Sequence, residues 1–165
     1  MNMDVTSFYL KDDGQIPNNS DLPVVVYKGA FDDGLPIQET FQQHNWKGSW
    51  TGDVFDFHHY HSNTHEVLAV KEGEATILVG GDEGERLQLK KGDAIVLPAG
   101  TGHKKLESSH DFEVVGAYPN GASFNTRKQD PADRTQAISE IKNVPVPNQD
   151  PIFGEEGPLL EKWIK

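Results

Sequence analysis

The chain has 165 residues, which is the size of one domain and enough to bury a sizeable core. It contains no cysteine, so disulfides and thiolate metal ligands are excluded, and any metal must be held by His, Asp, Glu or water. The formal net charge of -11 gives an acidic surface that repels phosphate backbones, so we expect no nucleic-acid partner.

The N-terminal third predicts an arm, a strand and a short helix. Residues 1–10 lack the basic start and apolar run of a signal peptide, and no stretch approaches the roughly 18 apolar residues of a membrane span. We therefore expect a cytoplasmic protein with no membrane partner. Turn sequences in residues 1–21 indicate an arm that lies over the domain. The β-branched run 22–27 predicts a strand, and residues 36–44, with proline in the first turn, predict a short helix.

A dense β region follows, from about residue 50 to residue 118. In residues 54–61, Phe55, Phe57, His59 and His61 alternate with a second set, and a period of two places the first set on one strand face. On this pattern the aromatic rings fill a barrel and the imidazoles lie at its open end. Further short strands separated by glycine and proline turns are predicted at 66–71, 75–79, 86–90, 94–97 and 112–118.

The C-terminal part changes in composition. Residues 120–130 predict a polar loop, and residues 131–142 predict a helix with Asp130 as its cap. The tail carries enough apolar side chains to dock on the domain or on a second subunit. No internal repeat is present, so we expect one domain over 1–165. Its parts are a core barrel at about 50–119, an N-terminal arm at 1–21, and a C-terminal helix and tail at about 130–165.

Four histidines fall within residues 58–65, a density that indicates a metal site. His59 and His61 are two apart, so both point to one side of a strand. After a turn, Glu66 opens the next strand and can face that pair, and His103 follows another turn that can deliver it from a fourth segment. These residue types, converging on one point, are suited to a divalent transition metal.

The spacing of these residues resembles the two motifs of the cupins. The first cupin motif is matched by Gly52, six residues, His59-Tyr60-His61, four residues, Glu66, six residues and Gly73. The second is matched by Gly92, five residues, Pro98-Ala99-Gly100, two residues and His103. The asparagine that ends the second motif is replaced by Glu107, but it is not a metal ligand in the family.

Several shorter stretches resemble the YjlB-like single-domain cupins, a branch whose function is uncharacterised. They are Asp12-Asp13-Gly14 to Asn18-Asn19, Gly48-Ser49-Trp50, His59-Tyr60-His61-Ser62 to His65-Glu66-Val67-Leu68, and Gly116-Ala117-Tyr118-Pro119. The resemblance implies an all-β fold with a single jelly-roll (double-stranded β-helix) barrel, an N-terminal arm and short peripheral helices. It also implies one metal in the barrel mouth, held by His59, His61, Glu66 and His103.

Three imidazoles and one carboxylate suit Fe, Mn, Ni, Co, Cu or Zn, with positions left open for a substrate. The alternative is a degenerate cupin whose polar residues only fill the mouth. For substrate binding we single out His65, Trp50 and Tyr118. Strand alternation points His65 away from the site, but that rule is loose at a strand start. Trp50 either lines the mouth or packs in the core, and His58 is expected outside the barrel.

These observations leave two functional hypotheses. The first is a metal-dependent enzyme acting on a small oxygen-containing molecule, by dioxygenation, isomerisation or decarboxylation. The alternative is a non-catalytic module that binds a metal or a small molecule. The fold alone does not choose between them. Because barrel strands leave edges that a partner can cover, we also expect a homodimer.

Overall fold

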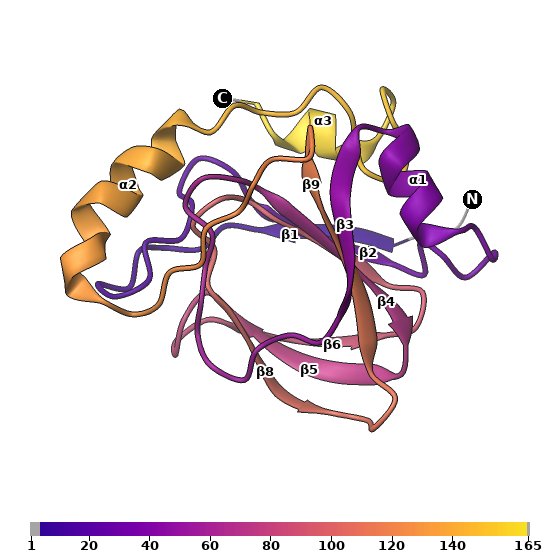
Figure 1. Cartoon of the computed structure of the whole chain (residues 1–165), viewed down its shortest axis with the longest axis horizontal. Helices are drawn as coiled ribbons and strands as arrows, with labels where there is room; N and C mark the ends of the chain where they lie inside the picture. The colour runs from indigo at the N-terminus through magenta and orange to yellow at the C-terminus, as the bar shows by residue number, and fades with distance from the viewer. Residues whose placement is uncertain (1–3, 165) are drawn as a thin grey trace.

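Two antiparallel sheets packed face to face form the body of the computed structural model, which describes residues 4–164 (Figure 1). The larger sheet has the order β1 (Asp4–Phe8), β2 (Val24–Lys28), β7 (Ala94–Leu97), β4 (Glu66–Glu72), β9 (Glu113–Pro119), β3 (Trp46–Gly52). The smaller has the order β6 (Glu85–Lys90), β5 (Glu74–Val79), β8 (His103–Ser108). The predicted all-β barrel is confirmed.

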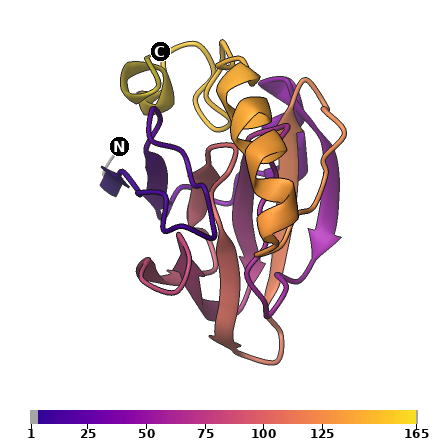
Figure 2. The ribbon, with the colours of Figure 1, turned by 90° about the vertical axis from the view of Figure 1, so that its left-hand side faces the viewer.

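The helices are short and lie around the larger sheet. They are α1 (Ile37–Gln43), the 3-10 helix η1 (Pro131–Asp133), α2 (Arg134–Asn143) and α3 (Pro158–Lys162). The Asp130 side chain accepts a hydrogen bond from the Ala132 amide, which confirms the predicted cap. In Figure 2, α2 lies alongside the strands. Within residues 4–164, no helix has the length and apolar character needed to cross a membrane.

The central strands of the larger sheet, β2, β7, β4 and β9, are buried on both faces, which explains why their sequences are largely apolar. One cluster, which includes Val26, Leu68 and Ile95, faces the smaller sheet and fills the barrel. A second cluster on the opposite face is covered by α1 and the C-terminal tail. The smaller sheet instead presents charged residues to solvent, so β6 shows the alternation expected of a strand with one wet face.

The C-terminal tail docks on the outer face of the larger sheet, which was one of the two predicted positions. Trp163 is buried there, and its indole N–H donates a 2.8 Å hydrogen bond to the Pro23 carbonyl. Asp150 fixes the start of this tail. Its buried carboxylate accepts hydrogen bonds from the Tyr27 hydroxyl at 2.7 Å and from the amides of Ile152, Phe153 and Leu159.

Two details differ from the expectations. The N-terminal arm contributes β1, and β1 and β2 extend the larger sheet beyond the expected core range of 50–119. Residues 53–58 are not a strand, although their aromatic alternation predicted one. The Phe55 carbonyl accepts a hydrogen bond from the Lys105 amide, but Phe55 is 52% exposed at the barrel mouth and does not fill the barrel.

Candidate metal centre

Residues 59–61 cross the barrel mouth as an irregular segment held from three sides. His59 and His103 exchange backbone hydrogen bonds of 3.3 and 3.0 Å. Tyr60 and Arg127 exchange two of 2.9 Å. The His61 carbonyl accepts a 2.7 Å hydrogen bond from the Gly100 amide, in the turn before β8. The backbone of this segment is therefore fixed without a regular strand.

Each of the three imidazoles has its Nδ1 against a backbone carbonyl. His59 Nδ1 lies 3.1 Å from the Phe57 carbonyl, and His103 Nδ1 lies 3.1 Å from the Thr101 carbonyl. His61 Nδ1 makes the equivalent contact with the Asn125 carbonyl. A carbonyl only accepts hydrogen bonds, so each Nδ1 carries a proton, and Nε2 is the nitrogen that each ring in its neutral form can offer to a metal. This arrangement is typical of metal-binding histidines.

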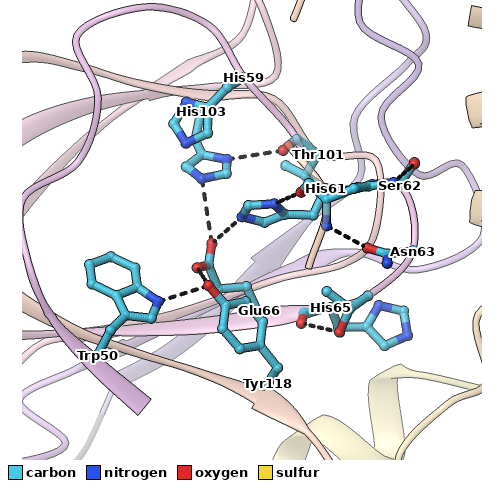
Figure 3. Close-up of polar contacts among 12 residues, drawn as sticks. Trp50, His59, His61, Ser62, Asn63, His65, Glu66, Thr101, His103 and Tyr118 are labelled. Atoms are coloured by element: carbon cyan, nitrogen blue, oxygen red, sulfur yellow. Dashed lines mark hydrogen bonds and ion pairs between the residues drawn. The ribbon is translucent and has the colours of Figure 1, made fainter. Parts of the chain in front are cut away.

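The carboxylate of Glu66 faces two of these nitrogens at the start of β4. Its Oε1 lies 3.3 Å from His61 Nε2 and 3.5 Å from His103 Nε2 (Figure 3). Although burial raises the pKa of Glu66, His61 and His103 outweigh it and hold that pKa well below its usual value of 4.5. For His61, burial lowers the pKa, but the Glu66 carboxylate raises it above its ordinary 6.5.

His59 lies beside this group. Its ring centroid is 4.0 Å from that of His103 and 6.1 Å from that of His61. Burial, and then the neighbouring His103, lower the pKa of His59 from 6.5 to about 3, so the ring is neutral at pH 7. A neutral ring keeps its Nε2 lone pair available.

A chain of hydrogen bonds supports the other oxygen of Glu66. The Trp50 indole N–H donates to the Tyr118 hydroxyl at 2.7 Å, and this hydroxyl donates to Glu66 Oε2 at 2.9 Å. Burial and the carboxylate raise the pKa of Tyr118 far above 10, so the hydroxyl keeps its proton. Gly116, opposite Trp50 in the β3–β9 register, makes room for the indole, because a Cβ there would lie 2.5 Å from the ring.

The residues present fit a divalent metal. The ligand atoms of His61, Glu66 and His103 lie within 4.8 Å of one another, and all three side chains are buried. Glu66 Oε1 is buried, and among the described residues its polar neighbours are the Nε2 atoms of His61 and His103, the same atoms that would bind a metal. The donor set of imidazole and carboxylate also suits a transition metal.

These side chains form the floor of a pocket of about 270 Å³. Trp50 and Tyr118, both predicted to bind substrate, line its wall together with Phe55 and Phe124. Phe124 stacks on Tyr118 with a centroid distance of 4.8 Å and an interplanar angle of 20°. The pocket is therefore polar at its floor and aromatic towards its mouth.

A polar network lies behind His61. The Ser62 hydroxyl donates to the Glu140 carboxylate on α2 at 2.7 Å and accepts hydrogen bonds from Arg127 Nε and Asn125 Nδ2. The Asn125 side chain in turn accepts from the Ser62 amide at 2.9 Å. Since the Asn125 carbonyl orients His61, this network connects α2 to the metal centre.

Two other histidines lie away from the pocket. His65, predicted to bind substrate, points away from Glu66 in Figure 3 and does not line the pocket. Its Nδ1 accepts a 2.9 Å hydrogen bond from the Ala99 amide, and its Nε2 lies 3.1 Å from the Pro145 carbonyl. His58 is buried outside the metal group, with its Nε2 2.8 Å from Asp82.

Sequence reasoning missed Phe124 and Asn125. Both belong to a segment predicted only as a polar loop, and each acts through a fold-dependent contact. Phe124 packs on His61 and Tyr118, and Asn125 contributes a backbone carbonyl that any residue could supply. No signal in a single sequence identifies such contacts.

Comparisons with known proteins agree with this geometry. The cupin domain model matches residues 50–113. The chain is 47% identical over 165 residues to the uncharacterized protein YjlB of Bacillus subtilis (strain 168), covering 100% of both chains. Among solved structures, an uncharacterized protein with a double-stranded beta-helix domain from Klebsiella pneumoniae is 19% identical (TM-score 0.39; 68% of this chain, 75% of that one). Procruciferin, an 11S globulin from Brassica napus, is 16% identical (TM-score 0.40; 86% of this chain, 33% of that one).

The two structural likenesses concern the fold alone. The family rests on the domain match and on the full-length relative, and both agree with the motif residues that converge at the barrel mouth. The chain therefore belongs to the cupin family, and it is similar to YjlB along its whole length.

Proposed function

We propose that this cupin is a metal-dependent enzyme that acts on a small oxygen-containing molecule. One divalent transition metal would be held by His59, His61, Glu66 and His103. The observation that carries the proposal is the convergence of His61, Glu66 and His103, whose ligand atoms lie within 4.8 Å of one another, with His59 beside them. The Nδ1 of each imidazole is tied to a backbone carbonyl, so Nε2 is the nitrogen left for a metal.

The bound metal would supply Lewis acidity, which polarises an oxygen of the substrate. The chain contributes the surroundings of that oxygen. Glu66 remains ionised because its pKa is held low, and Tyr118 keeps its carboxylate in one orientation. The apolar and aromatic residues of the pocket wall lower the local dielectric and so strengthen electrostatic interactions with the substrate. Dioxygenation, isomerisation and decarboxylation are all compatible with such a site.

The first experiment is elemental analysis of purified protein, reported as metal per chain. We expect about one equivalent of a transition metal, and His61→Ala should lose most of it. His110→Ala is the matched control, because His110 is exposed and lies outside the metal group. Metal content in His61→Ala equal to that of the wild type would overturn the ligand assignment.

A turnover assay distinguishes an enzyme from a non-catalytic binding module. Candidate acids, sugars and diketones would be incubated with metal-loaded and metal-free protein, and product formation followed by mass spectrometry. Metal-dependent turnover of any of them supports the enzyme. Saturable binding without turnover across the panel would support the non-catalytic binding module.

We further propose that the chain forms one domain and works as a homodimer in the cytoplasm. The edge strands β1, β3 and β6 support the dimer, since within residues 4–164 each has a side that pairs with no other strand and that another copy could cover. Sedimentation equilibrium at micromolar concentration should give twice the chain mass of 18.3 kDa. A single species at the chain mass would contradict the dimer.

A further inference from the structure

We infer that the pocket takes a flat, aromatic or conjugated molecule that binds through oxygen donors and carries at most one negative charge in total. This inference rests on the proposed metal site and narrows its substrate class. Three independent features of the pocket support it: the aromatic surfaces at its mouth, the charges of its lining, and its volume.

The mouth is bounded by two exposed aromatic rings from different segments. Phe55 is 52% exposed and Phe124 is 49% exposed, although both line the pocket. Each ring is held in place from behind. Phe55 stacks on Phe57 with centroids 4.8 Å apart and 17° between the planes, and Phe124 stacks on Tyr118. Two half-exposed rings, each stacked on a second aromatic ring, are suited to stacking with a planar ligand.

The charges of the pocket limit the ligand to a small negative charge. Among the described residues that line it, none is lysine or arginine. Asp53 lies at the rim, and Lys105 pairs with it at 2.7 Å. The nearby Lys128 lies over the Phe57 ring, with its Nζ 4.7 Å from the centroid, and does not line the pocket. A divalent metal beside the Glu66 carboxylate leaves one positive charge, which matches a singly charged oxygen donor.

The volume of about 270 Å³ is slightly below the range of about 300–1,000 Å³ found for pockets of drug-sized ligands. It suits a single ring with its oxygen-bearing substituent. With the metal ligands at the floor and the aromatic rings at the mouth, the donor oxygens would point inwards and the ring outwards.

The test uses two hydroxamates that present the same metal-chelating head. Benzohydroxamate has a phenyl ring where acetohydroxamate has a methyl group. Calorimetric titration into zinc-loaded protein should show benzohydroxamate binding at least about tenfold tighter, because the ring adds stacking and buried apolar area. A third probe, 4-carboxybenzohydroxamate, adds one negative charge and should bind at least about threefold more weakly than benzohydroxamate, since no lysine or arginine among the lining residues faces it.

Substitutions test whether the aromatic rings at the mouth cause the preference for benzohydroxamate. In the double variant Phe55→Leu/Phe124→Leu, the preference for benzohydroxamate over acetohydroxamate should fall below about threefold. Tyr9→Leu is the matched control, because Tyr9 is 63% exposed and does not line the pocket. Since Phe124 contacts the His61 ring, zinc content is measured for every variant, and Phe55→Leu alone tests the inference if the double variant fails to fold.

The outcomes separate the two proposals. Failure to load zinc or any other transition metal overturns the proposed function, and the inference with it. Zinc loading with equal affinity for the two uncharged-tail hydroxamates overturns the inference alone. An unchanged preference in the double variant, or equal binding of the carboxylated probe, likewise shows that the aromatic mouth or the charge limit has been wrongly assigned.

Discussion

The substitution Tyr118→Phe removes a single oxygen atom and tests whether the Tyr118 hydroxyl holds the Glu66 carboxylate in place. In the folded chain, the Tyr118 hydroxyl donates to Glu66 Oε2 at 2.9 Å and accepts from the Trp50 indole N–H at 2.7 Å. Tyr118 and Glu66 are both buried, so water does not readily replace the lost partner. Phenylalanine keeps the ring that stacks on Phe124.

The expected loss in the free energy of unfolding follows from these two hydrogen bonds. A hydrogen bond to an ionised carboxylate contributes about 1.5–3 kcal/mol to stability, and a neutral one contributes about 1 kcal/mol. The half-buried Trp50 side chain recovers part of its loss from solvent. We therefore expect the free energy of unfolding of the metal-free protein to fall by about 2–3 kcal/mol. Glu66 also loses its orientation, so metal affinity should fall about 10–100-fold.

Urea denaturation of metal-free protein, followed by circular dichroism, measures the first effect, and a competition titration with a chelator measures the second. Tyr9→Phe is the control, since it removes the hydroxyl of an exposed tyrosine and should change stability by less than about 0.5 kcal/mol. A loss below about 1 kcal/mol in Tyr118→Phe, with unchanged metal affinity, would refute the role of this hydroxyl in holding the carboxylate.

Three further predictions concern other parts of the chain. The pKa of His59 in the folded protein, about 3, lies below its ordinary 6.5, so the unfolded chain takes up the proton first. Metal-free protein should then lose up to about 1.4 kcal/mol of stability per pH unit between 6.5 and 3, and His59→Gln should flatten this part of the urea-midpoint profile. Ser62→Ala should lower metal affinity about tenfold in a chelator competition, and it should also lower the free energy of unfolding by about 1–3 kcal/mol because the buried hydroxyl makes three hydrogen bonds; an unchanged affinity would show that the network behind His61 does not position it. Asp150→Asn should destabilise the protein by about 3 kcal/mol in urea, because an amide cannot accept all four hydrogen bonds that the carboxylate accepts; a loss under 1 kcal/mol would contradict that role.

The barrel and the convergence of its polar residues could be predicted because both leave local signals. Continuous apolar runs predicted β2, β4 and β7, which are buried on both faces. The spacing of His61, Glu66 and His103 predicted that they would meet, and the structure brings them together. His61 and Glu66 are joined by a short turn, whereas His103 comes near them because Glu66 pairs with Leu97 in the β4–β7 register, and one short turn leads from Leu97 to His103.

The strands that were not predicted bury little surface, so their sequences lack the apolar pattern that identifies a strand. β1 and β3 are the two edge strands of the larger sheet and are mostly exposed, and β8 lies at the edge of the smaller sheet and is only partly buried. Residues 53–58 were wrongly predicted to be a strand, because their alternating aromatic residues follow the pattern expected of one. Here the backbone bends, and both Phe55 and Phe57 stay near the mouth, where they stack on each other.

The position of the C-terminal tail has a consequence for how the chain is made. Residues from Asp150 to Trp163 cover the outer face of the larger sheet, whose strands have all been synthesised by residue 119. Translation proceeds at about 5–20 residues per second, so at least about two seconds separate the last strand from the tail. During that interval the nascent sheet has an uncovered apolar face, and ribosome-associated chaperones would find their binding surface there.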